Sequence, residues 1–168
     1  MKPAILVIDI QNAWLENDGL RASVEKRIGV INRAIQWFRK NGLPVIVISH
    51  EEEKSGVVIG TKPFEFVDSV NVDKNDIRVT KHYPNSFCKT ELESILKEHG
   101  CDTVLIVGLS ASGCALATCL GAVDHDLNSY LVKDGVAAAN EEHVRFAEEI
   151  CGTVSVDSFD KTLRNPAL

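Results

Sequence analysis

The stretch Asp102-Thr-Val-Leu-Ile-Val-Gly-Leu-Ser-Ala-Ser-Gly-Cys-Ala-Leu-Ala-Thr118 contains the pattern that decides the fold. Residues 104–107 form a short apolar run of the kind that is buried in a parallel sheet, and Gly108 ends it. Small residues follow through Gly113, and Cys114 then begins a pattern with apolar residues at helical spacing. The stretch therefore predicts a strand, a tight turn and a helix with a cysteine in its first turn.

Three familiar turn motifs do not fit this stretch. A serine nucleophile elbow needs G-x-S-x-G, but Ser112 stands at the position of the last glycine. A phosphate-binding loop has lysine where Cys114 stands, and Ser110 replaces the second glycine of the dinucleotide motif G-x-G-x-x-G. A cysteine nucleophile remains. Because a helix N-terminus offers free N–H groups and partial positive charge, we expect a lowered pKa for the Cys114 thiol.

Strand and helix patterns alternate along the rest of the chain. Apolar runs predict strands at residues 4–10, 44–49, 77–80, 104–107, 129–132 and 153–156. Helical spacing predicts helices at residues 24–38, 90–96, 114–123 and 141–151. Residues 50–75 have little periodicity and indicate a long loop, a feature that is usually functional. The alternation predicts a doubly wound, Rossmann-like α/β fold, with a mostly parallel sheet of about six strands and helices on both faces.

Length and composition narrow the class of protein. A chain of 168 residues with 45% apolar and 25% charged residues predicts one domain over residues 1–168. The net charge of −6 argues against nucleic acid or an anionic membrane as a partner. The N-terminal apolar run is too short for a signal peptide or a membrane span. The odd number of cysteines, five, follows no disulfide or zinc spacing, so we expect a cytoplasmic protein.

Three chemically complementary residues are expected at one edge of the sheet. Asp9, Lys81 and Cys114 each stand at or just after the carboxyl end of a predicted strand, where open α/β sheets bind ligands. Taken singly, Asp9 fits a turn cap and Lys81 fits a solvated lysine. Taken together, the lysine would favour a cysteine thiolate and the carboxylate would move its proton. The three residues therefore form a candidate catalytic group.

Four motifs, in their order and spacing, resemble those of the isochorismatase-like cysteine hydrolases, and the resemblance covers nearly the whole chain. They are the first-strand motif Asp9-Ile-Gln11-Asn12, the block of Lys81 with Asn85-Ser86-Phe87 and Thr90-x-Leu92, the nucleophile helix from Cys114 to Thr118 with Val107-Gly108 before it, and a strand-end aspartate at Asp134. An Asp–Lys–Cys triad hydrolyses amides and related bonds in that family. The resemblance therefore implies these catalytic roles for Asp9, Lys81 and Cys114.

The implied function is cysteine-dependent hydrolysis of a small amide or related C–N bond through a thioester. We expect no cofactor and no metal, because nicotinamidases of the family carry a D-x-H…H metal site after the second strand, and here residues 49–54 contain His50 with no second histidine nearby. Isochorismatases proper typically lack the cysteine, so Cys114 argues against their substrate. His50 is expected to be a partly exposed loop residue and residues 51–53 a solvated charge run. The alternative is a non-catalytic or redox-sensing protein that retains the fold.

The resemblance also implies details of the site and of assembly. Proteins of this kind carry a cis peptide five residues before the nucleophile, which predicts a cis bond between Leu109 and Ser110. The N–H groups of Ser110 and Cys114 would then form an oxyanion hole. Trp14, Phe87 and Leu109 are expected to contact substrate, with core packing an equal alternative for Trp14 and Phe87. The expected partners are a small-molecule substrate and further copies of the chain, as a dimer or tetramer.

Overall fold

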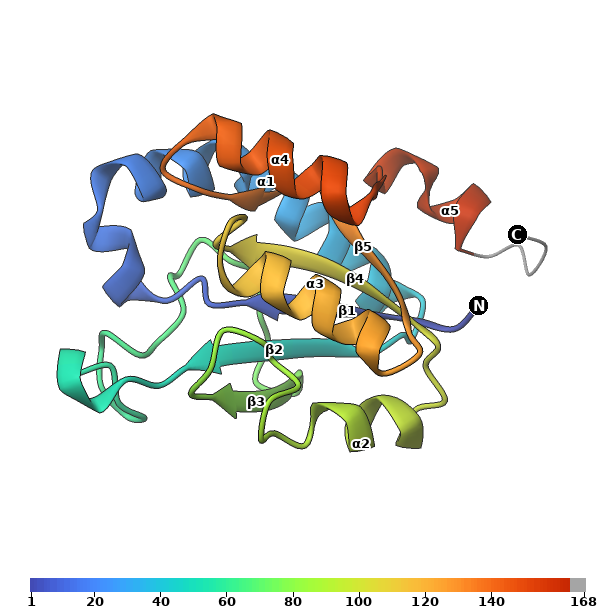
Figure 1. Cartoon of the computed structure of the whole chain (residues 1–168), viewed down its shortest axis with the longest axis horizontal. Coiled ribbons are helices and arrows are strands. Elements are labelled where there is room, and N and C mark those ends of the chain that lie inside the picture. The colour runs from blue at the N-terminus through green and yellow to red at the C-terminus, as the bar shows by residue number, and fades with distance from the viewer. Residues whose placement is uncertain (164–168) are drawn as a thin grey trace.

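The computed structural model, which describes residues 1–163, contains a six-stranded sheet whose paired strands are all parallel (Figure 1). The strands are β1 (Pro3–Ile8), β2 (Val45–His50), β3 (Ile77–Lys81), β4 (Thr103–Leu109), β5 (Asn128–Ala137) and β6 (Thr153–Val154). They are arranged in the order β3-β2-β1-β4-β5-β6. The chain thus builds outward from β1 and then returns to build outward from β4, which confirms the predicted doubly wound fold. Ligands bind such sheets at this reversal, beyond the carboxyl ends of the strands.

Helices cover both faces of the sheet. The α-helices are α1 (Asp18–Lys40), α2 (Leu92–Glu98), α3 (Cys114–Asp124), α4 (Glu141–Cys151) and α5 (Phe159–Thr162), and the short 3-10 helices are η1 (Asn12–Glu16), η2 (Glu53–Ser55) and η3 (Val156–Ser158). Helices α2, α3 and α4 pack on one face, while α1 and α5 pack on the other. Alternate residues of a strand point to opposite faces, so Leu6 and Ile8 of β1 join the first core and Ile5 and Val7 join the second. Burial on both faces explains why the strands β1, β2 and β4 are almost continuously apolar.

A glycine brings the two central strands together at the edge where ligands are expected. Gly108 pairs with Ile8 and has φ of +114°, and a Cβ on it would lie 2.1 Å from the Ile8 carbonyl oxygen. Only glycine tolerates both the conformation and the contact. The carboxyl ends of β1 and β4 can therefore approach closely.

Strand β5 differs from its prediction. It extends to Ala137 instead of ending near Val132, and its pairing with β4 shifts in register, so Ile106 faces Leu131 while Gly108 faces Val136. Asp134 lies inside this bulge with φ of 58°, so the prediction of a strand-end aspartate is wrong. The bulge is held from outside the sheet, because the Asp134 N–H donates to the carboxylate of Glu148 at 2.9 Å.

Helix α1 also begins earlier than its apolar pattern predicted. The side chain of Asn17 accepts a hydrogen bond from the Leu20 N–H and caps the helix, which starts at Asp18. Its first turn is mostly exposed, so apolar periodicity did not mark it. Within residues 1–163, no helix has both the length and the apolar character needed to cross a membrane.

Candidate active site

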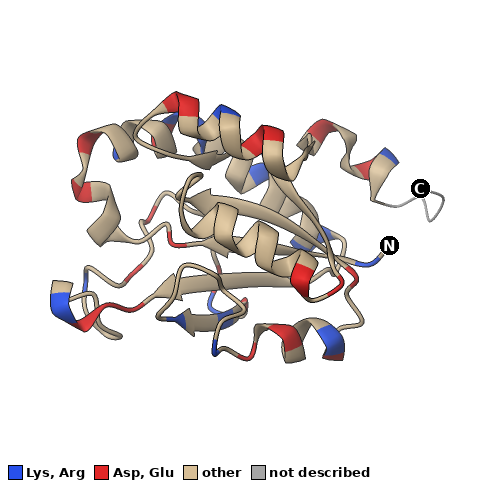
Figure 2. Cartoon of the chain, in the orientation of Figure 1, with Lys and Arg blue, Asp and Glu red and all other residues tan. Residues whose placement is uncertain are grey.

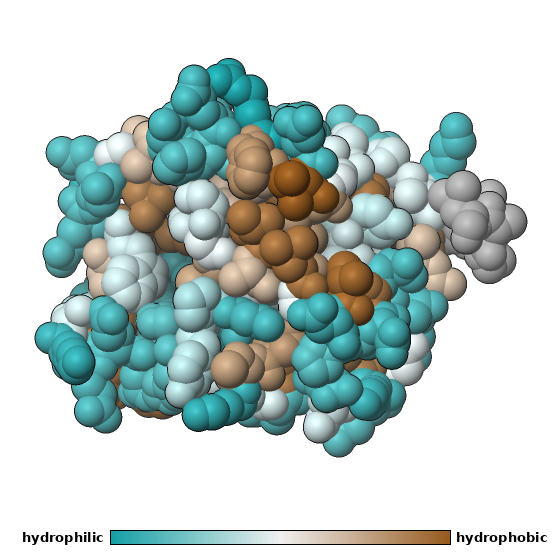
Figure 3. Space-filling model, viewed as in Figure 1, coloured by the Kyte–Doolittle hydropathy of each residue, from teal (hydrophilic) through white to brown (hydrophobic). Residues whose placement is uncertain are grey.

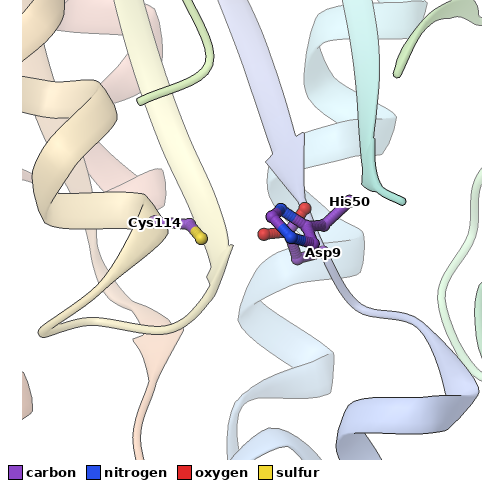
Figure 4. Close-up of side chains that lie close together, drawn as sticks. All are labelled: Asp9, His50 and Cys114. Atoms are coloured by element: carbon purple, nitrogen blue, oxygen red, sulfur yellow. The ribbon is translucent and has the colours of Figure 1, made fainter. Parts of the chain in front are cut away.

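The carboxyl ends of three neighbouring strands and the start of α3 deliver four side chains to one point. Asp9 follows β1, His50 ends β2, Lys81 ends β3, and Cys114 begins α3. Figure 4 shows Asp9, His50 and Cys114 converging from these elements. Asp9 adopts φ of 54°, which is uncommon for a residue with a Cβ and is typical of functional positions. The structure therefore brings together the three residues of the predicted triad and adds a histidine.

Lys81 is the centre of this group. Its side chain is fully buried, and its Nζ lies 2.8 Å from Asp9 Oδ2, 3.0 Å from His50 Nδ1 and 3.2 Å from Cys114 Sγ. An ammonium group has three N–H donors, and these three acceptors match them in number. Burial of the charge is offset by the adjacent carboxylate, so Lys81 is not the solvated lysine that a lone strand-end lysine would suggest.

Asp9 has one engaged and one unengaged carboxylate oxygen. Oδ2 pairs with Lys81, whereas Oδ1 is buried without a hydrogen-bond partner among the described residues. Burial raises the pKa of Asp9, and the charge and hydrogen bond of Lys81 partly oppose the rise. A carboxylate with a raised pKa and a free oxygen is suited to accept a proton.

The Cys114 thiol does not behave as its helix position suggested. Burial raises its pKa to about 11, the negative charge of Asp9 adds to the rise, and Lys81 opposes it. The expectation of a lowered pKa is therefore wrong for the free protein. The helix N-terminus and the lysine are outweighed by loss of water and by the neighbouring carboxylate. Proton transfer to Asp9 offers a way to form the thiolate when it is needed.

His50 is a residue of the site that the sequence analysis placed on an ordinary loop. It pairs with Lys81 in the β2–β3 register, so the two side chains leave adjacent strand ends. The ammonium of Lys81 has no lone pair, so His50 Nδ1 must accept from it and the proton must reside on Nε2. Burial lowers the pKa of His50, and Lys81 lowers it further. The sequence did offer one indication of this role, because His50 stands at the end of a predicted strand, as Lys81 does.

The motif residue Gln11 holds the parts of the site that come from the loops. It is fully buried, and its Nε2 donates to the carbonyl oxygens of His50 and Phe64 at 3.1 and 2.9 Å. Its Oε1 accepts from the His50 N–H at 2.9 Å and from the Trp14 indole N–H at 3.2 Å. Asn12 similarly donates to the carbonyls of Lys62 and Glu65. The D-x-Q-N motif therefore joins the first strand to the long loop.

A cavity of about 320 Å³ opens at this group of side chains, a volume that suits a small molecule. Asp9 and Cys114 line it, together with the predicted Trp14, Leu109 and Ser110. A larger hollow of about 460 Å³, beside Pro44 and His99, lies at the opposite edge of the sheet and contains none of the four convergent residues. Of these two, the smaller cavity is the one that combines a nucleophile, a proton acceptor and an apolar wall.

Three lining residues were not named individually, although they lie in residues 11–20 and 50–75, the two segments that the sequence leads us to expect around the pocket. One residue that was expected to contact substrate does not line the cavity. Leu20, His50 and Glu52 contribute to its wall, so the charge run is not entirely solvated surface. Phe87 is buried in the core on the α3 side of the sheet and stacks on His125, with ring centroids 4.7 Å apart. Of the two roles expected for Phe87, core packing is therefore the one that the structure shows.

The turn before the nucleophile closes without a cis peptide. Every peptide bond in residues 1–163 is trans, so the prediction of a cis bond between Leu109 and Ser110 is wrong. The Ser110 carbonyl accepts hydrogen bonds from the N–H groups of Gly113 and Ala115, at 2.9 and 3.1 Å. These two bonds tighten the turn, and a non-proline cis bond would add a cost of about 3–4 kcal/mol. The trans bond removes the reason by which the Ser110 N–H was expected to point at the oxyanion, so what still supports a shared oxyanion hole is that both Ser110 and Cys114 line the cavity.

The same cluster offers atoms that metal ions prefer. Asp9, His50 and Cys114 each present one ligand atom, and these atoms lie within 4.8 Å of one another. The Nζ of Lys81, however, lies within hydrogen-bond distance of all three residues. The ammonium thus already supplies the positive charge at their centre, so the donor set does not fit a resident cation.

A family model described as the isochorismatase domain matches residues 3–150. YddQ of Bacillus subtilis, an isochorismatase family protein, is 30% identical over 160 residues, which cover 88% of this chain and 89% of that protein. The maleamate amidohydrolase of Pseudomonas putida is 26% identical over 156 residues, covering 80% of this chain and 72% of the enzyme.

Solved structures share the fold over almost the whole chain. The N-carbamoylsarcosine amidase of Thermoplasma acidophilum superposes with a TM-score of 0.78 at 27% identity, covering 92% of this chain and 95% of the amidase. An isochorismatase-like hydrolase from Alkaliphilus metalliredigens has a TM-score of 0.88 at 24% identity, covering 98% and 92% of the two chains. The second likeness concerns the fold alone.

Proposed function

This chain belongs to the isochorismatase family of hydrolases, and on that premise we propose that it cleaves the C–N bond of a small amide with Cys114 as nucleophile. Two similar proteins, a maleamate amidohydrolase and an N-carbamoylsarcosine amidase, are named for reactions of this kind. The observation that carries the proposal is the position of Lys81, whose ammonium contacts both the Asp9 carboxylate and the Cys114 sulfur.

In the first half of the reaction, the Cys114 thiol transfers its proton to Asp9, and the sulfur attacks the amide carbonyl carbon. Asp9 Oδ1 has no other hydrogen-bond partner, so it is available for this proton. Lys81 stabilises the developing thiolate at 3.2 Å. Asp9 then gives the proton to the leaving nitrogen, the C–N bond breaks, and a thioester remains on Cys114.

In the second half, Asp9 removes a proton from water, and the resulting hydroxide attacks the thioester carbonyl. The C–S bond breaks, the acid product leaves, and the proton on Asp9 returns to the Cys114 sulfur. The sum is amide plus water giving a carboxylic acid plus ammonia or an amine. The N–H groups of Ser110 and Cys114 are assigned to the oxyanion of both tetrahedral intermediates.

His50 and Gln11 support this chemistry without touching the reacting carbon. His50 accepts a hydrogen bond from one N–H group of the Lys81 ammonium, which leaves the other two N–H groups for Asp9 and Cys114. Gln11 fixes the backbone of His50 and the ring of Trp14. Both are positioning residues, because each acts through another side chain.

The experiment tests hydrolysis of a panel of small primary amides. Ammonia release measures turnover, and mass spectrometry of the protein detects the acyl-enzyme. Cys114→Ala should lower kcat by about 10⁴-fold or more, because no other group can form the thioester. Cys119→Ala, a change of the same kind five residues along the same helix, is the control and should keep activity. Unchanged hydrolysis in Cys114→Ala would overturn the triad assignment.

The raised pKa of Cys114 argues against the redox-sensing alternative. Sensor cysteines are accessible thiolates with low pKa values, whereas burial and Asp9 keep this thiol protonated near neutral pH. A thiol that must first transfer its proton to a base is typical of a nucleophile used during turnover.

A further inference from the structure

We propose that the cavity accepts amides carrying an alkylammonium group, which Glu52 and Trp14 bind; the proposal rests on the amidohydrolase function above. The charges that line the cavity are the first reason. Asp9 is balanced by Lys81, but among residues 1–163 the carboxylate of Glu52 has no cationic partner, and no lysine or arginine of those residues lines the cavity. The wall therefore carries an excess negative charge that favours a cation.

Nearby basic side chains do not cancel this charge. Arg21 follows the lining residue Leu20, but its guanidinium donates to the Leu15 carbonyl and to Asp18. Figure 2 shows basic and acidic residues side by side in the segment after β2. Lys54 belongs to η2 in that segment, and it does not line the cavity. His50 is kept neutral by burial and by Lys81, because both lower its pKa.

Glu52 is an exposed residue whose backbone is fixed by its own loop. It forms an antiparallel bridge with Val57, with N–H to carbonyl distances of 2.9 and 3.1 Å in the two directions. Gly56, in the left-handed region, closes the turn between them. The Ser55 hydroxyl donates to Glu52 Oε2. A neutral donor on one oxygen keeps the charge and leaves Oε1 for a ligand.

Trp14 adds an aromatic wall to the same cavity. Its indole N–H donates to Gln11, and its ring meets His50 edge-on at a centroid distance of 5.9 Å. The ring is thereby held in place before any ligand arrives. A carboxylate together with an aromatic face is the composition that recognises alkylammonium groups, through an ion pair and a cation–π contact.

The first test measures the charge preference at Cys114 without requiring turnover. Three methanethiosulfonates that differ in charge, with trimethylammonium, hydroxyl or sulfonate ends, each form a mixed disulfide with Cys114 by displacing a sulfinate. Mass spectrometry of the Cys114 peptide measures the rate of mixed-disulfide formation. Each rate is divided by the rate of the same reagent with a free thiol in solution. The ratio of cationic to anionic rate cancels the thiolate fraction, so a change in the Cys114 pKa does not affect it.

We expect this ratio to exceed one in the unmodified protein and to fall about three- to tenfold in Glu52→Gln. Glu53→Gln is the matched control, because it removes the same charge from the adjacent residue, which does not line the cavity. It should leave the ratio close to the starting value. A ratio below one, or an equal fall in both variants, would overturn the proposal.

The second test uses three primary amides of similar length: 4-aminobutanamide, valeramide and succinamate, which are cationic, neutral and anionic. We expect kcat/KM to decrease in that order, and Glu52→Gln to reduce the preference for the cation about tenfold, mainly through KM. Preference for succinamate would contradict the proposal while upholding amide hydrolysis. If no amide were hydrolysed, the proposed function would fail, and the thiosulfonate ratio would still decide the charge preference.

Discussion

At the residue scale, two opposing effects act on the thiol of Cys114. Its place at the start of α3, beside the Lys81 ammonium, favours the thiolate. Burial and the Asp9 carboxylate favour the thiol, and together they raise the pKa to about 11. In the free site the proton therefore resides on the Cys114 sulfur near neutral pH. The thiolate can therefore form only when another group removes this proton.

This balance predicts the pH dependence of Cys114 alkylation. Iodoacetamide reacts with the thiolate, so its rate at the Cys114 peptide should rise about tenfold per pH unit and level off only near pH 11. The folded-state pKa lies above the ordinary value, so the thiol form stabilises the fold at lower pH, and this contribution is lost as pH rises toward 11. Peptide mass spectrometry after timed quenching measures the rate.

The control for this prediction is Asp9→Asn. Removal of the negative charge should lower the Cys114 pKa, so the rate should level off at a lower pH than in the unmodified protein. A plateau already below pH 7 in the unmodified protein would show that Lys81 and the helix N-terminus outweigh burial.

At the scale of elements, the position of α3 depends on its contact with the segment that follows β3. Thr118 of α3 accepts from the Ser86 N–H at 3.1 Å and shares a hydrogen bond with the Ser86 hydroxyl. Gly121, one turn later, leaves room for Asn85, whose amide atoms would lie 2.3–2.6 Å from a Cβ at position 121. The same helix begins with Cys114, so this contact also helps to place the nucleophile.

We expect Gly121→Ala to destabilise the protein by about 1–3 kcal/mol, because the new methyl group must displace Asn85. Asn85 Oδ1 accepts from the Phe87 N–H at 3.0 Å, so displacement also breaks a hydrogen bond. Gly29→Ala in α1 is the matched control. Nothing lies within 4 Å of its added Cβ, and it should stabilise by about 0.5–1 kcal/mol. Urea unfolding measures both, and equal effects would refute the contact argument.

At the scale of the whole molecule, one face carries exposed apolar side chains from two adjacent helices. Leu120 and Val123 of α3 are 50% and 61% exposed, and Phe146 and Ile150 of α4 are 54% and 53% exposed. Figure 3 shows apolar residues gathered over these helices. Contiguous exposed apolar surface is typical of an interface between proteins. We propose that a second copy of the chain covers this face, as the family resemblance implied.

Light scattering at micromolar concentration should therefore report a dimer or tetramer of the 18.4 kDa chain. Val123→Glu should shift the protein toward the monomer, because it places a charge in the covered apolar face. Ile59→Glu makes a similar change at a residue that is 60% exposed and lies on neither helix, and it should leave the assembly intact. A monomeric unmodified protein would remove this prediction.

The sequence by itself determined the order of strands and helices and the placement of the triad. The strands β1, β2 and β4 are nearly continuous apolar runs. Helix α4 matched its prediction because Asn140 caps it and Gly152 ends it. Parallel strands share one carboxyl edge, so Asp9 and Lys81 could be assigned to a common site without knowledge of distances. Local patterns and the rules of sheet topology were sufficient for these features.

Only the tertiary structure decided the electrostatics and the wall of the cavity. The direction of the Cys114 pKa depends on how much water reaches the sulfur, and that depends on segments far apart in the chain. For the same reason, His50 and Glu52, which were expected on a loop facing solvent, line the cavity. Phe87, which was expected either to contact substrate or to pack in the core, lies in the core. Whether a strand-end or loop side chain faces a cavity, a core or solvent is set by the packing of distant elements, which local sequence patterns do not record.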